Sequence, residues 1–310
     1  MKILFLSPSD PLDKWRAMMG DIMPKLELIN WEPGLEPRDD IDYALVWKPP
    51  AGVLKTYTGL KAILSLGAGV DGIFVDPQLP KHLPIVRLID QGLTEGMSEY
   101  MIYWTLHFHR DFDVYNQRAK DKQWKQHRQA ITASRRIGVM GMGELGGDAA
   151  KKLHALSFDV AGWSRSPKSI DSVESFSGEE GMVPFLERSD ILICLLPLTD
   201  ATQGIINKQL LSHLPKNAVL INGARGGHVV DDDLRDALDS GHLRAAVLDV
   251  FNIEPLPEDH YWWDHPKVII TPHIASQTQP HSAAERIKYS IECFERGETP
   301  PNVVDLNKGY

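Results

Sequence analysis

Cysteine is scarce in this sequence: Cys194 and Cys293 are the two present among 310 residues. Cys194 lies in the apolar run Ile191-Leu-Ile-Cys-Leu-Leu196, where a buried free thiol is the usual state. A reducing, cytoplasmic setting therefore fits better than a disulfide-stabilised secreted protein. Long apolar runs are also missing near the start, where Ile3-Leu-Phe-Leu6 is only as long as a strand. We therefore expect neither a signal peptide nor a membrane span there.

An excess of positive charge is absent as well. The formal net charge is −9, which argues against a nucleic-acid partner because phosphate binding needs a concentrated basic face. With 43% hydrophobic and 24% charged residues, the composition is that of an ordinary globular protein. At 310 residues the chain is long for a single core, so two domains are expected.

Short β-rich runs alternate with helical stretches along the whole chain. We expect strands at 2–6, 43–47, 62–66, 85–88, 136–140, 159–163, 190–195, 218–222, 245–249 and 268–270. We expect helices at 95–112, 146–157, 208–214, 231–240 and 280–296. Apolar strands that alternate with helices indicate parallel sheets covered on both faces. The predicted fold is α/β, with two Rossmann-like doubly wound parallel-sheet domains and an active-site cleft between them.

The long helices suggest how the two domains divide. We expect residues 1–97 plus 277–310 to form a substrate-binding (lid) domain and residues 98–276 to form a dinucleotide-binding domain. In this interpretation the helix at 280–296 returns the C-terminal segment to the first domain.

A Gly-x-Gly-x-x-Gly motif follows the strand at 136–140 and opens a helix. Gly141 permits a tight turn, Gly143 lets the backbone approach a pyrophosphate, and Gly146 allows the helix to pack closely on the strand. The free N–H groups and dipole of the helix would hold the phosphates. The motif alone is weak, and a plain glycine-rich turn is the alternative; its place between a strand and a helix favours a dinucleotide site.

The end of the next strand bears on the choice of cofactor. An NAD site usually carries an acidic residue there for the ribose 2′-hydroxyl. This chain has Ser164 instead, followed by Arg165 and Lys168, and cations attract a 2′-phosphate. We therefore predict that NADP(H) is preferred, with NAD(H) as the alternative. The remaining residues that we expect to bind the cofactor are Met142, Glu144, Leu145, Ser166, Leu196, Pro197, Thr202, Gly223 and Ala224.

Three polar residues at later strand ends are candidates for catalysis. Arg225, in Asn222-Gly-Ala-Arg225-Gly226, presents a forked cation suited to the carboxylate of a small 2-oxo acid. His273 is the candidate proton donor, and Glu254 could orient its ring by accepting a hydrogen bond from the other nitrogen. Asp249, also at a strand end, is a candidate to hold the nicotinamide amide. Without Arg225 and Glu254 beside it, His273 would be an ordinary loop histidine.

Taken together, these motifs resemble the D-2-hydroxyacid dehydrogenase family. The glycine loop, Asn-x-Ala-Arg-Gly, Asp-Val-Phe…Glu-Pro-Leu and Thr-Pro-His all occur in its order. Within the family, the chain is most similar to the bacterial glyoxylate/hydroxypyruvate reductase A branch. That likeness runs through Ala44-Leu-Val-Trp47-Lys48-Pro-Pro50, Leu66-Gly-Ala-Gly-Val-Asp71, Trp163-Ser-Arg-Ser166, Leu238-Asp-Ser-Gly241 and Gly309-Tyr310. The resemblance implies that Arg225 binds substrate, that His273 donates the proton with Glu254 as its partner, and that the protein is a homodimer built through the cofactor domains.

The same resemblance adds a substrate pocket in the first domain. Backbone N–H groups of the loop with Ala68, Gly69 and Val70 would hold the acid end of the substrate, opposite Arg225. Trp47 and Lys48 match positions that wall the pocket in the branch, although a core role for Trp47 is equally open. Lys48 departs from the branch, which has a histidine there, and Gly223 and Gly227 make the arginine loop richer in glycine than usual.

The expected function is NADPH-dependent reduction of small 2-oxo acids, glyoxylate to glycolate and hydroxypyruvate to D-glycerate. Two alternatives remain: a dehydrogenase for a bulkier or phosphorylated acid, and a nucleotide-sensing, corepressor-like binding protein. The other histidines lack metal-ligand spacing, so no metal site is expected. Trp124 is a candidate to reach the other subunit of a dimer.

Overall fold

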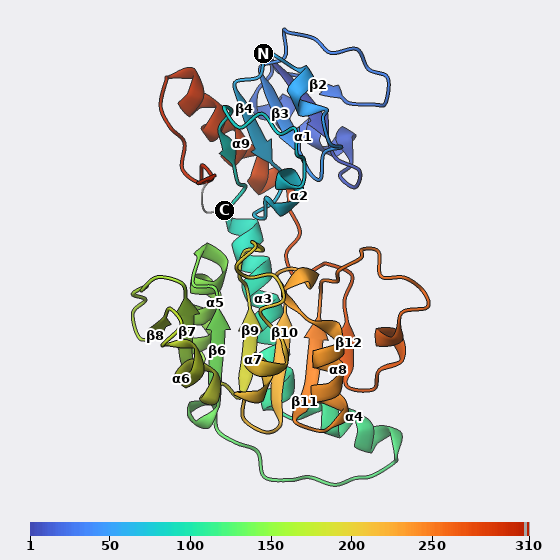
Figure 1. The fold of residues 1–310 in the computed structure, drawn as a ribbon, viewed down its shortest axis with the longest axis vertical. Coiled ribbons are helices and arrows are strands. Elements are labelled where there is room, and N and C mark those ends of the chain that lie inside the picture. Colours follow the sequence, from blue (N-terminus) through green and yellow to red (C-terminus); the bar gives the residue numbers. More distant parts are fainter. Residues whose placement is uncertain (307–308, 310) are drawn as a thin grey trace. The chain divides into compact units, whose positions relative to one another are not determined.

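The structure, a computed structural model, describes residues 1–306 and 309. The chain divides into two compact units: the first unit contains Met1–Leu93 and Gln277–Tyr310, and the second unit contains Thr94–Ser276 (Figure 1). The first boundary falls inside α3 (Gln91–His109), four residues before the break expected between 97 and 98. Leu93 belongs to a core of the first unit, whereas Met97 packs in a core of the second. Tyr310, one of the motif residues above, lies outside the described residues.

The second unit contains a seven-stranded sheet in which every strand pair is parallel. Its order is β12-β11-β10-β9-β6-β7-β8. The strands are β6 (Arg136–Met140), β7 (Asp159–Ser164), β8 (Glu174–Ser177), β9 (Ile191–Cys194), β10 (Ala218–Asn222), β11 (Leu243–Leu248) and β12 (Val268–Ile270). The strand order reverses between β6 and β9, and ligands of such sheets bind at the carboxyl ends beside this reversal.

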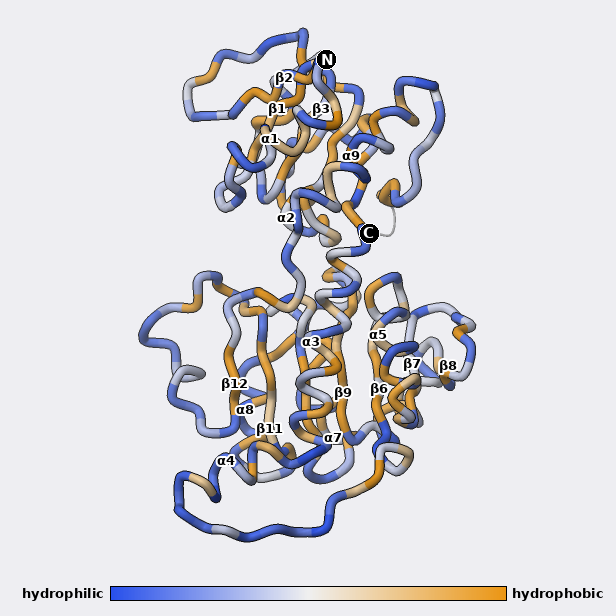
Figure 2. The backbone as a smooth tube through the Cα atoms, turned by 180° about the vertical axis from the view of Figure 1, so that it is seen from behind, coloured by the Kyte–Doolittle hydropathy of each residue, from blue (hydrophilic) through white to orange (hydrophobic). Residues whose placement is uncertain are grey.

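Alternate residues of these strands face two separate apolar cores. On one face, Leu192 and Leu220 pack with α6 (Met182–Glu187), α7 (Lys208–Ser212) and α8 (Asp231–Asp239). On the other face, Ile193 and Ile221 pack with α3 and α5 (Glu144–Ala155). Figure 2 shows the central strands as hydrophobic and the segments that connect them as largely hydrophilic. The sheet is therefore covered by helices on both sides, as the apolar strand sequences predicted.

The first unit is built on a five-stranded parallel sheet in the order β2-β1-β3-β4-β5. Its strands are β1 (Lys2–Leu6), β2 (Glu27–Asn30), β3 (Tyr43–Val46), β4 (Ala62–Ser65) and β5 (Ile85–Val86). One face packs against α1 (Leu12–Ile22) and α9 (Pro280–Glu295), and the other carries α2 (Asp71–Phe74). The C-terminal helix thus contributes Ala283, Ile287 and Ile291 to a core whose strands come from the start of the chain. The predicted fold class, two doubly wound parallel sheets, is confirmed.

Several elements were not predicted from the sequence, namely β2, β8, α1, α2, α6 and α4 (Phe112–Lys120). The two missed strands are four residues long, lie at sheet edges and are only partly buried, so they lack the continuous apolar run that marked the others. The predicted strand at 85–88 is shorter in the structure, since β5 ends at Val86. Both cysteines are buried and unpaired, as expected.

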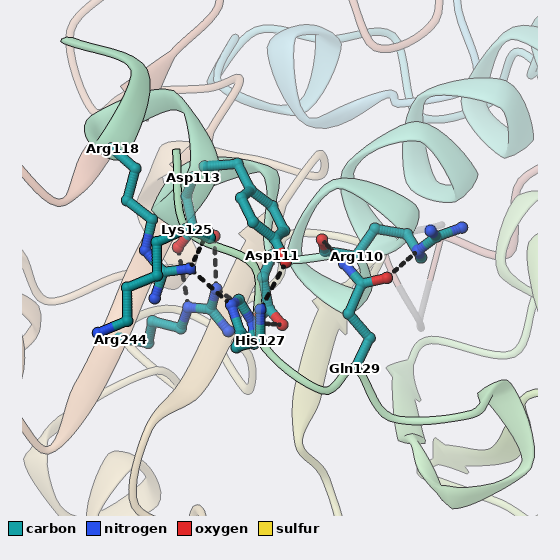
Figure 3. Close-up of polar contacts among 9 residues, drawn as sticks. Arg110, Asp111, Asp113, Arg118, Lys125, His127, Gln129 and Arg244 are labelled. Carbon is teal, nitrogen blue, oxygen red and sulfur yellow. Dashed lines mark hydrogen bonds and ion pairs between the residues drawn. The ribbon is translucent and has the colours of Figure 1, made fainter. Parts of the chain in front are cut away.

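A polar network braces the far end of α3 against the sheet (Figure 3). Arg244 of β11 forms ion pairs with Asp111 and Asp113, which flank the start of α4. His127 bonds Asp111 through Nε2 at 2.9 Å, and its ring stacks on Tyr115 with the centroids 5.0 Å apart. These contacts hold the irregular segment after α4, which includes the fully exposed Trp124, against the helices.

Candidate active site

The predicted site residues of the second unit follow the carboxyl ends of six neighbouring parallel strands. The glycine loop, residues 141–146, follows β6, and Ser164 ends β7. Leu196 and Pro197 follow β9, and Thr202 folds the next turn by donating from Oγ1 to the Pro197 carbonyl at 2.7 Å. Gly223, Ala224 and Arg225 follow β10, Asp249 follows β11, and His273 follows β12. Because all strands are parallel, these residues share one edge of the sheet.

The glycine loop has the geometry expected of a phosphate cradle. Gly141 has φ +100°, and a Cβ there would lie 2.5 Å from the Leu195 carbonyl oxygen. A Cβ on Gly146 would lie 1.9 Å from the Gly141 oxygen, so α5 can start only if this residue has no side chain. Around Gly143, in contrast, the Cβ position is open space within the described chain. The backbone is thus tight on its inner side and accessible where a dinucleotide would approach the helix N-terminus.

The segment expected to determine whether NADP(H) or NAD(H) is preferred begins at the end of β7, the strand that pairs with β6. Ser164 donates from Oγ to the Ser166 carbonyl at 2.7 Å, which closes a turn at the end of β7. Arg165, Ser166 and Lys168 are exposed on this turn. Two cations on an exposed turn beside the glycine loop suit a phosphate better than a lone ribose hydroxyl.

The Arg225 loop, residues 223–227, is held by buried polar side chains. Asn222 is fully buried; its amide donates to the Arg225 carbonyl at 2.9 Å, and its oxygen accepts from the Ala224 N–H at 3.1 Å. His228, also fully buried, lies 3.1 Å from the Arg225 carbonyl through Nδ1 and 3.3 Å from the Pro197 carbonyl through Nε2. Sequence reasoning missed both roles, although a polar residue ending an all-apolar strand was a usable signal for Asn222.

The structure pairs His273 with Glu254. The imidazole Nδ1 lies 2.9 Å from Oε2 of Glu254, whose Oε1 accepts the Phe251 N–H at 3.1 Å. Glu254 is therefore oriented by its own backbone before it orients the ring. With Nδ1–H donated to the carboxylate, Nε2 is the nitrogen available to a ligand, and it makes no hydrogen bond within residues 1–306 and 309. The side chain of His273 is 32% exposed.

Close backbone packing brings the Arg225 loop next to this pair. A Cβ on Gly226 would lie 2.0 Å from the carbonyl carbon of Phe251, three residues before Glu254. A Cβ on Gly223 would approach Met101 of α3 to 2.4 Å and Ala275 to 3.6 Å. Gly226 of the motif and Gly223, one of the two glycines noted above as a departure, thus allow the loop to touch the segments that carry Glu254 and His273.

Asp249 has a structural role that the sequence did not indicate, because its carboxylate accepts hydrogen bonds from the segment around His273. Its carboxylate is 1% exposed and accepts from the N–H groups of Ile274 at 2.9 Å and Ala275 at 2.8 Å. The Thr271 hydroxyl donates to the same carboxylate at 2.6 Å. Residues 271–275, the His273 loop, are therefore folded around Asp249. His273 itself has φ +55°, a left-handed conformation that costs a non-glycine residue on the order of 1–2 kcal/mol.

The remaining predicted residues belong to the first unit. Trp47 and Lys48 follow β3, and the loop with Ala68, Gly69 and Val70 follows β4. A Cβ on Gly67 would lie 2.6 Å from the Trp47 ring, so the indole packs against this loop. Ser65 shapes the loop by accepting the Gly67 N–H at 3.2 Å. The N–H groups of Ala68 and Gly69 donate no hydrogen bond within the part of the chain that the structure describes.

Comparisons with known proteins show the family of this chain. The family model for the D-isomer specific 2-hydroxyacid dehydrogenase NAD binding domain matches residues 102–275. The glyoxylate/hydroxypyruvate reductase A of Serratia proteamaculans (strain 568) is 44% identical over 317 residues, covering 100% of both chains. This chain belongs to the D-isomer specific 2-hydroxyacid dehydrogenase family. The family resemblance seen in the sequence motifs is thereby confirmed.

Solved structures of this dehydrogenase family are similar over the whole length. An enzyme of the family from Xanthobacter autotrophicus Py2, in complex with NADPH and MES, has a TM-score of 0.96 at 37% identity, covering 100% of this chain and 99% of its own. The NADPH-dependent glyoxylate/hydroxypyruvate reductase of Sinorhizobium meliloti, in complex with NADP and sulfate, has a TM-score of 0.93 at 38% identity, covering 100% of both. Among the described residues, no helix is long and apolar enough to cross a membrane, and no cluster of metal-ligating side chains occurs.

Proposed function

We propose that this dehydrogenase catalyses the NADPH-dependent reduction of small 2-oxo acids, glyoxylate to glycolate and hydroxypyruvate to D-glycerate. The observation that carries the proposal is the His273–Glu254 pair, 2.9 Å apart, beside the Arg225 loop at the carboxyl edge of the sheet. A proton donor next to a forked cation is what the reduction of a carbonyl adjacent to a carboxylate requires. The substrates follow from the named relative that is 44% identical over its full length.

Each residue of the trio has a separate role in the proposed reaction. Arg225 binds the substrate carboxylate and polarises the adjacent carbonyl. Nε2 of His273 donates its proton to the carbonyl oxygen as the reaction proceeds, while Glu254 keeps Nδ1 protonated and the ring in place. A bound nicotinamide cofactor would supply the hydride that the carbonyl carbon receives. The product is a 2-hydroxy acid with the proton on oxygen derived from His273.

The chain's own residues fit an NADP cofactor. The glycine loop, with Met142, Glu144 and Leu145 at the start of α5, holds the pyrophosphate against the helix N-terminus. Ser164, Arg165, Ser166 and Lys168 bind the 2′-phosphate, so NADP(H) is preferred over NAD(H). Leu196, Pro197, Thr202, Gly223 and Ala224 contribute the surface at the ends of β9 and β10, and Asp249 holds the nicotinamide amide. Two solved relatives are in complex with a phosphorylated dinucleotide, one with NADPH and the other with NADP.

The first unit takes the role of a substrate-binding lid domain, and the second that of the dinucleotide-binding domain. Backbone N–H groups of Ala68, Gly69 and Val70 bind the substrate carboxylate, which their lack of partners among the described residues supports. Trp47 and Lys48 restrict the pocket to small acids, and the packing of the Trp47 ring on Gly67 supports this role. Trp47→Ala should then widen the range of accepted 2-oxo acids; an unchanged substrate profile would remove this role.

We also propose a homodimer built through the cofactor domains and located in the cytoplasm. The fully exposed Trp124, on the segment after α4, supports a contact with the second subunit. Light scattering on the purified protein tests the dimer, and a monomer at micromolar concentration would contradict it. Fractionation of the native host tests the location.

Steady-state kinetics of the purified protein test the proposed reaction. NADPH and NADH are each paired with glyoxylate, hydroxypyruvate, pyruvate, larger 2-oxo acids and phosphorylated hydroxy acids. We expect the highest kcat/KM with NADPH and one of the two smallest acids. A clear preference for a bulkier or phosphorylated acid would replace the substrate assignment. Tight NADPH binding without turnover of any acid would point to a nucleotide-sensing protein and would contradict the enzyme.

A further inference from the structure

A hydroxyl chain connects helix α3 to the His273 loop within the second unit. The Tyr100 hydroxyl, on α3, lies 2.6 Å from Oγ1 of Thr271, and Oγ1 lies 2.6 Å from Oδ1 of Asp249. The motifs discussed above do not include Tyr100, and Thr271 entered only as part of Thr-Pro-His. Both bonds join side chains, so neither hydroxyl takes part in the backbone hydrogen bonds of a strand or helix.

The chemistry of the groups decides which of them donates in each of these two hydrogen bonds. A hydroxyl group has one hydrogen, and Thr271 donates it to the carboxylate, which is an acceptor. Thr271 must then accept from Tyr100, so the phenol is the donor at the start of the chain. Burial raises the pKa of Tyr100 well above its usual value of 10, and the nearby Asp249 raises it further, although the Thr271 bond acts against this. The phenol therefore keeps its proton throughout the neutral range.

The series of hydrogen bonds ends at Asp249, which holds the backbone of the proposed proton donor, His273. Asp249 accepts the N–H groups of Ile274 and Ala275, the two residues after His273, and its carbonyl accepts the His273 N–H at 2.8 Å. The left-handed φ of His273 persists only if such contacts hold it. Tyr100 joins this set to α3, a 19-residue helix, so the loop is tied to a rigid element and not only to its own neighbours.

We propose that Tyr100 and Thr271 are positioning residues for the reduction: with the Asp249 carboxylate, they hold the His273 loop so that Nε2 faces the substrate carbonyl. This inference rests on the function proposed above, because it assigns His273 as the proton donor. Neither residue touches the reacting atoms. Their removal changes where the imidazole lies and leaves the glycine loop that binds the cofactor unchanged.

Thr271→Val and Tyr100→Phe test the proposal, since each removes one hydroxyl at nearly constant volume. With glyoxylate and NADPH, we expect kcat to fall about tenfold for Thr271→Val and about threefold for Tyr100→Phe, the effect of losing a hydrogen bond to a charged and to a neutral partner. The KM for NADPH should change less than kcat does, because the glycine loop and the residues at the 2′-phosphate keep their contacts and only the nicotinamide end, at Asp249, lies next to the altered hydroxyls. Thr271→Ser should restore most of kcat by replacing the donor.

Two buried hydroxyls elsewhere provide matched controls. Thr105, on the same helix, and Tyr57, in the first unit, have hydroxyl groups without a hydrogen-bond partner in the described part of the chain. Thr105→Val and Tyr57→Phe remove the same atoms and should leave kcat unchanged. Losses equal to those of Thr271→Val and Tyr100→Phe would mean that the effect is general destabilisation, and would overturn the proposal.

Amide hydrogen exchange over residues 271–275 gives a readout that does not depend on turnover. Exchange at Ile274 and Ala275 should accelerate in Thr271→Val and Tyr100→Phe, and not in the two controls. Unchanged exchange, or faster exchange with an unchanged kcat, would overturn the positioning role. If the unaltered protein reduces no 2-oxo acid, the proposed function fails separately, while the exchange comparison still decides whether the hydroxyl chain restrains the loop.

Discussion

Among single residues, Arg225 shows how the chain prepares a side chain for one task. Its backbone is extended, its carbonyl is held by Asn222 and lies 3.1 Å from Nδ1 of His228, and its own Nη1 donates to the Ala224 carbonyl at 2.7 Å. The guanidinium is therefore oriented before any ligand arrives, which reduces the entropy lost on binding an acid. The sequence shows that an arginine stands here, but it does not show the hydrogen bonds that hold the arginine in place.

Arg225→Ala is predicted to impair the reduction without unfolding the protein. The transition-state stabilisation, calculated from kcat/KM for glyoxylate, should fall by about 2–4 kcal/mol, because a charged group that stabilises the transition state is lost. Arg225→Lys should recover part of the loss, since it restores the charge without the forked donors. Steady-state kinetics with a melting curve measure both effects. A variant with nearly full kcat/KM would remove Arg225 from the mechanism.

At the scale of elements, the start of α5 separates two uses of glycine. Gly146 is required by packing, since its missing side chain lets the helix approach the Gly141 carbonyl, whereas Gly143 borders open space. The motif predicted a packing role for Gly146 and a ligand-facing role for Gly143. The fold adds the distances that show how strictly the packing role excludes a side chain.

Gly143→Ala and Gly146→Ala are therefore predicted to behave differently. Gly146→Ala should lower the free energy of unfolding by about 1–3 kcal/mol, the usual cost of overpacking. Gly143→Ala should melt like the unaltered protein but bind NADPH about tenfold more weakly, which corresponds to roughly 1.4 kcal/mol lost where the pyrophosphate approaches. Calorimetry and fluorescence titration measure the two quantities. Equal NADPH affinity in Gly143→Ala would argue against a phosphate at this loop.

The sequence predicted the strands well where both faces of the strand are buried. Strands such as β9 and β10 are buried at every position and read as continuous apolar runs. The edge strand β8 has the exposed sequence Glu-Ser-Phe-Ser, which carries no such signal, and it forms because β7 offers it a parallel partner. Helix α4 was missed because none of its residues is buried; ion pairs of Asp111 and Asp113 with Arg244 hold its start to β11.

For the folded molecule as a whole, this network predicts a dependence of stability on pH (Figure 3). Burial alone would raise the pKa of Asp111, but hydrogen bonds from His127 and Arg244 outweigh it and hold the pKa below its usual 3.8. Because the pKa is lower in the folded state, the carboxylate contributes stability above about pH 4, near its unfolded pKa. That contribution is lost as pH falls through the folded value.

Asp111→Asn should therefore destabilise the protein at neutral pH by about 1–3 kcal/mol, the range for hydrogen bonds to a charged group. The difference from the unaltered protein should shrink as the pH falls from about 4 through the lower folded pKa, below which the carboxylate is protonated in both states. Urea unfolding at pH 7 and pH 3 measures it. Asp13→Asn is the control, because Asp13 pairs with Arg16 while 94% exposed and should change little at either pH. A difference that stays constant with pH would contradict the role of Asp111.

Local chemistry could be read from the chain alone. Glycine spacing, apolar strand runs and the identities of Arg225, Glu254 and His273 depend on residues close in sequence, so the fold class and the family were predictable. Only long-range contacts could decide that Asp249 organises the His273 loop, that Tyr100 reaches it through Thr271, and that α9 completes the first unit. Such partners lie far apart along the chain, and burial in a shared core or a shared hydrogen bond is what selects them.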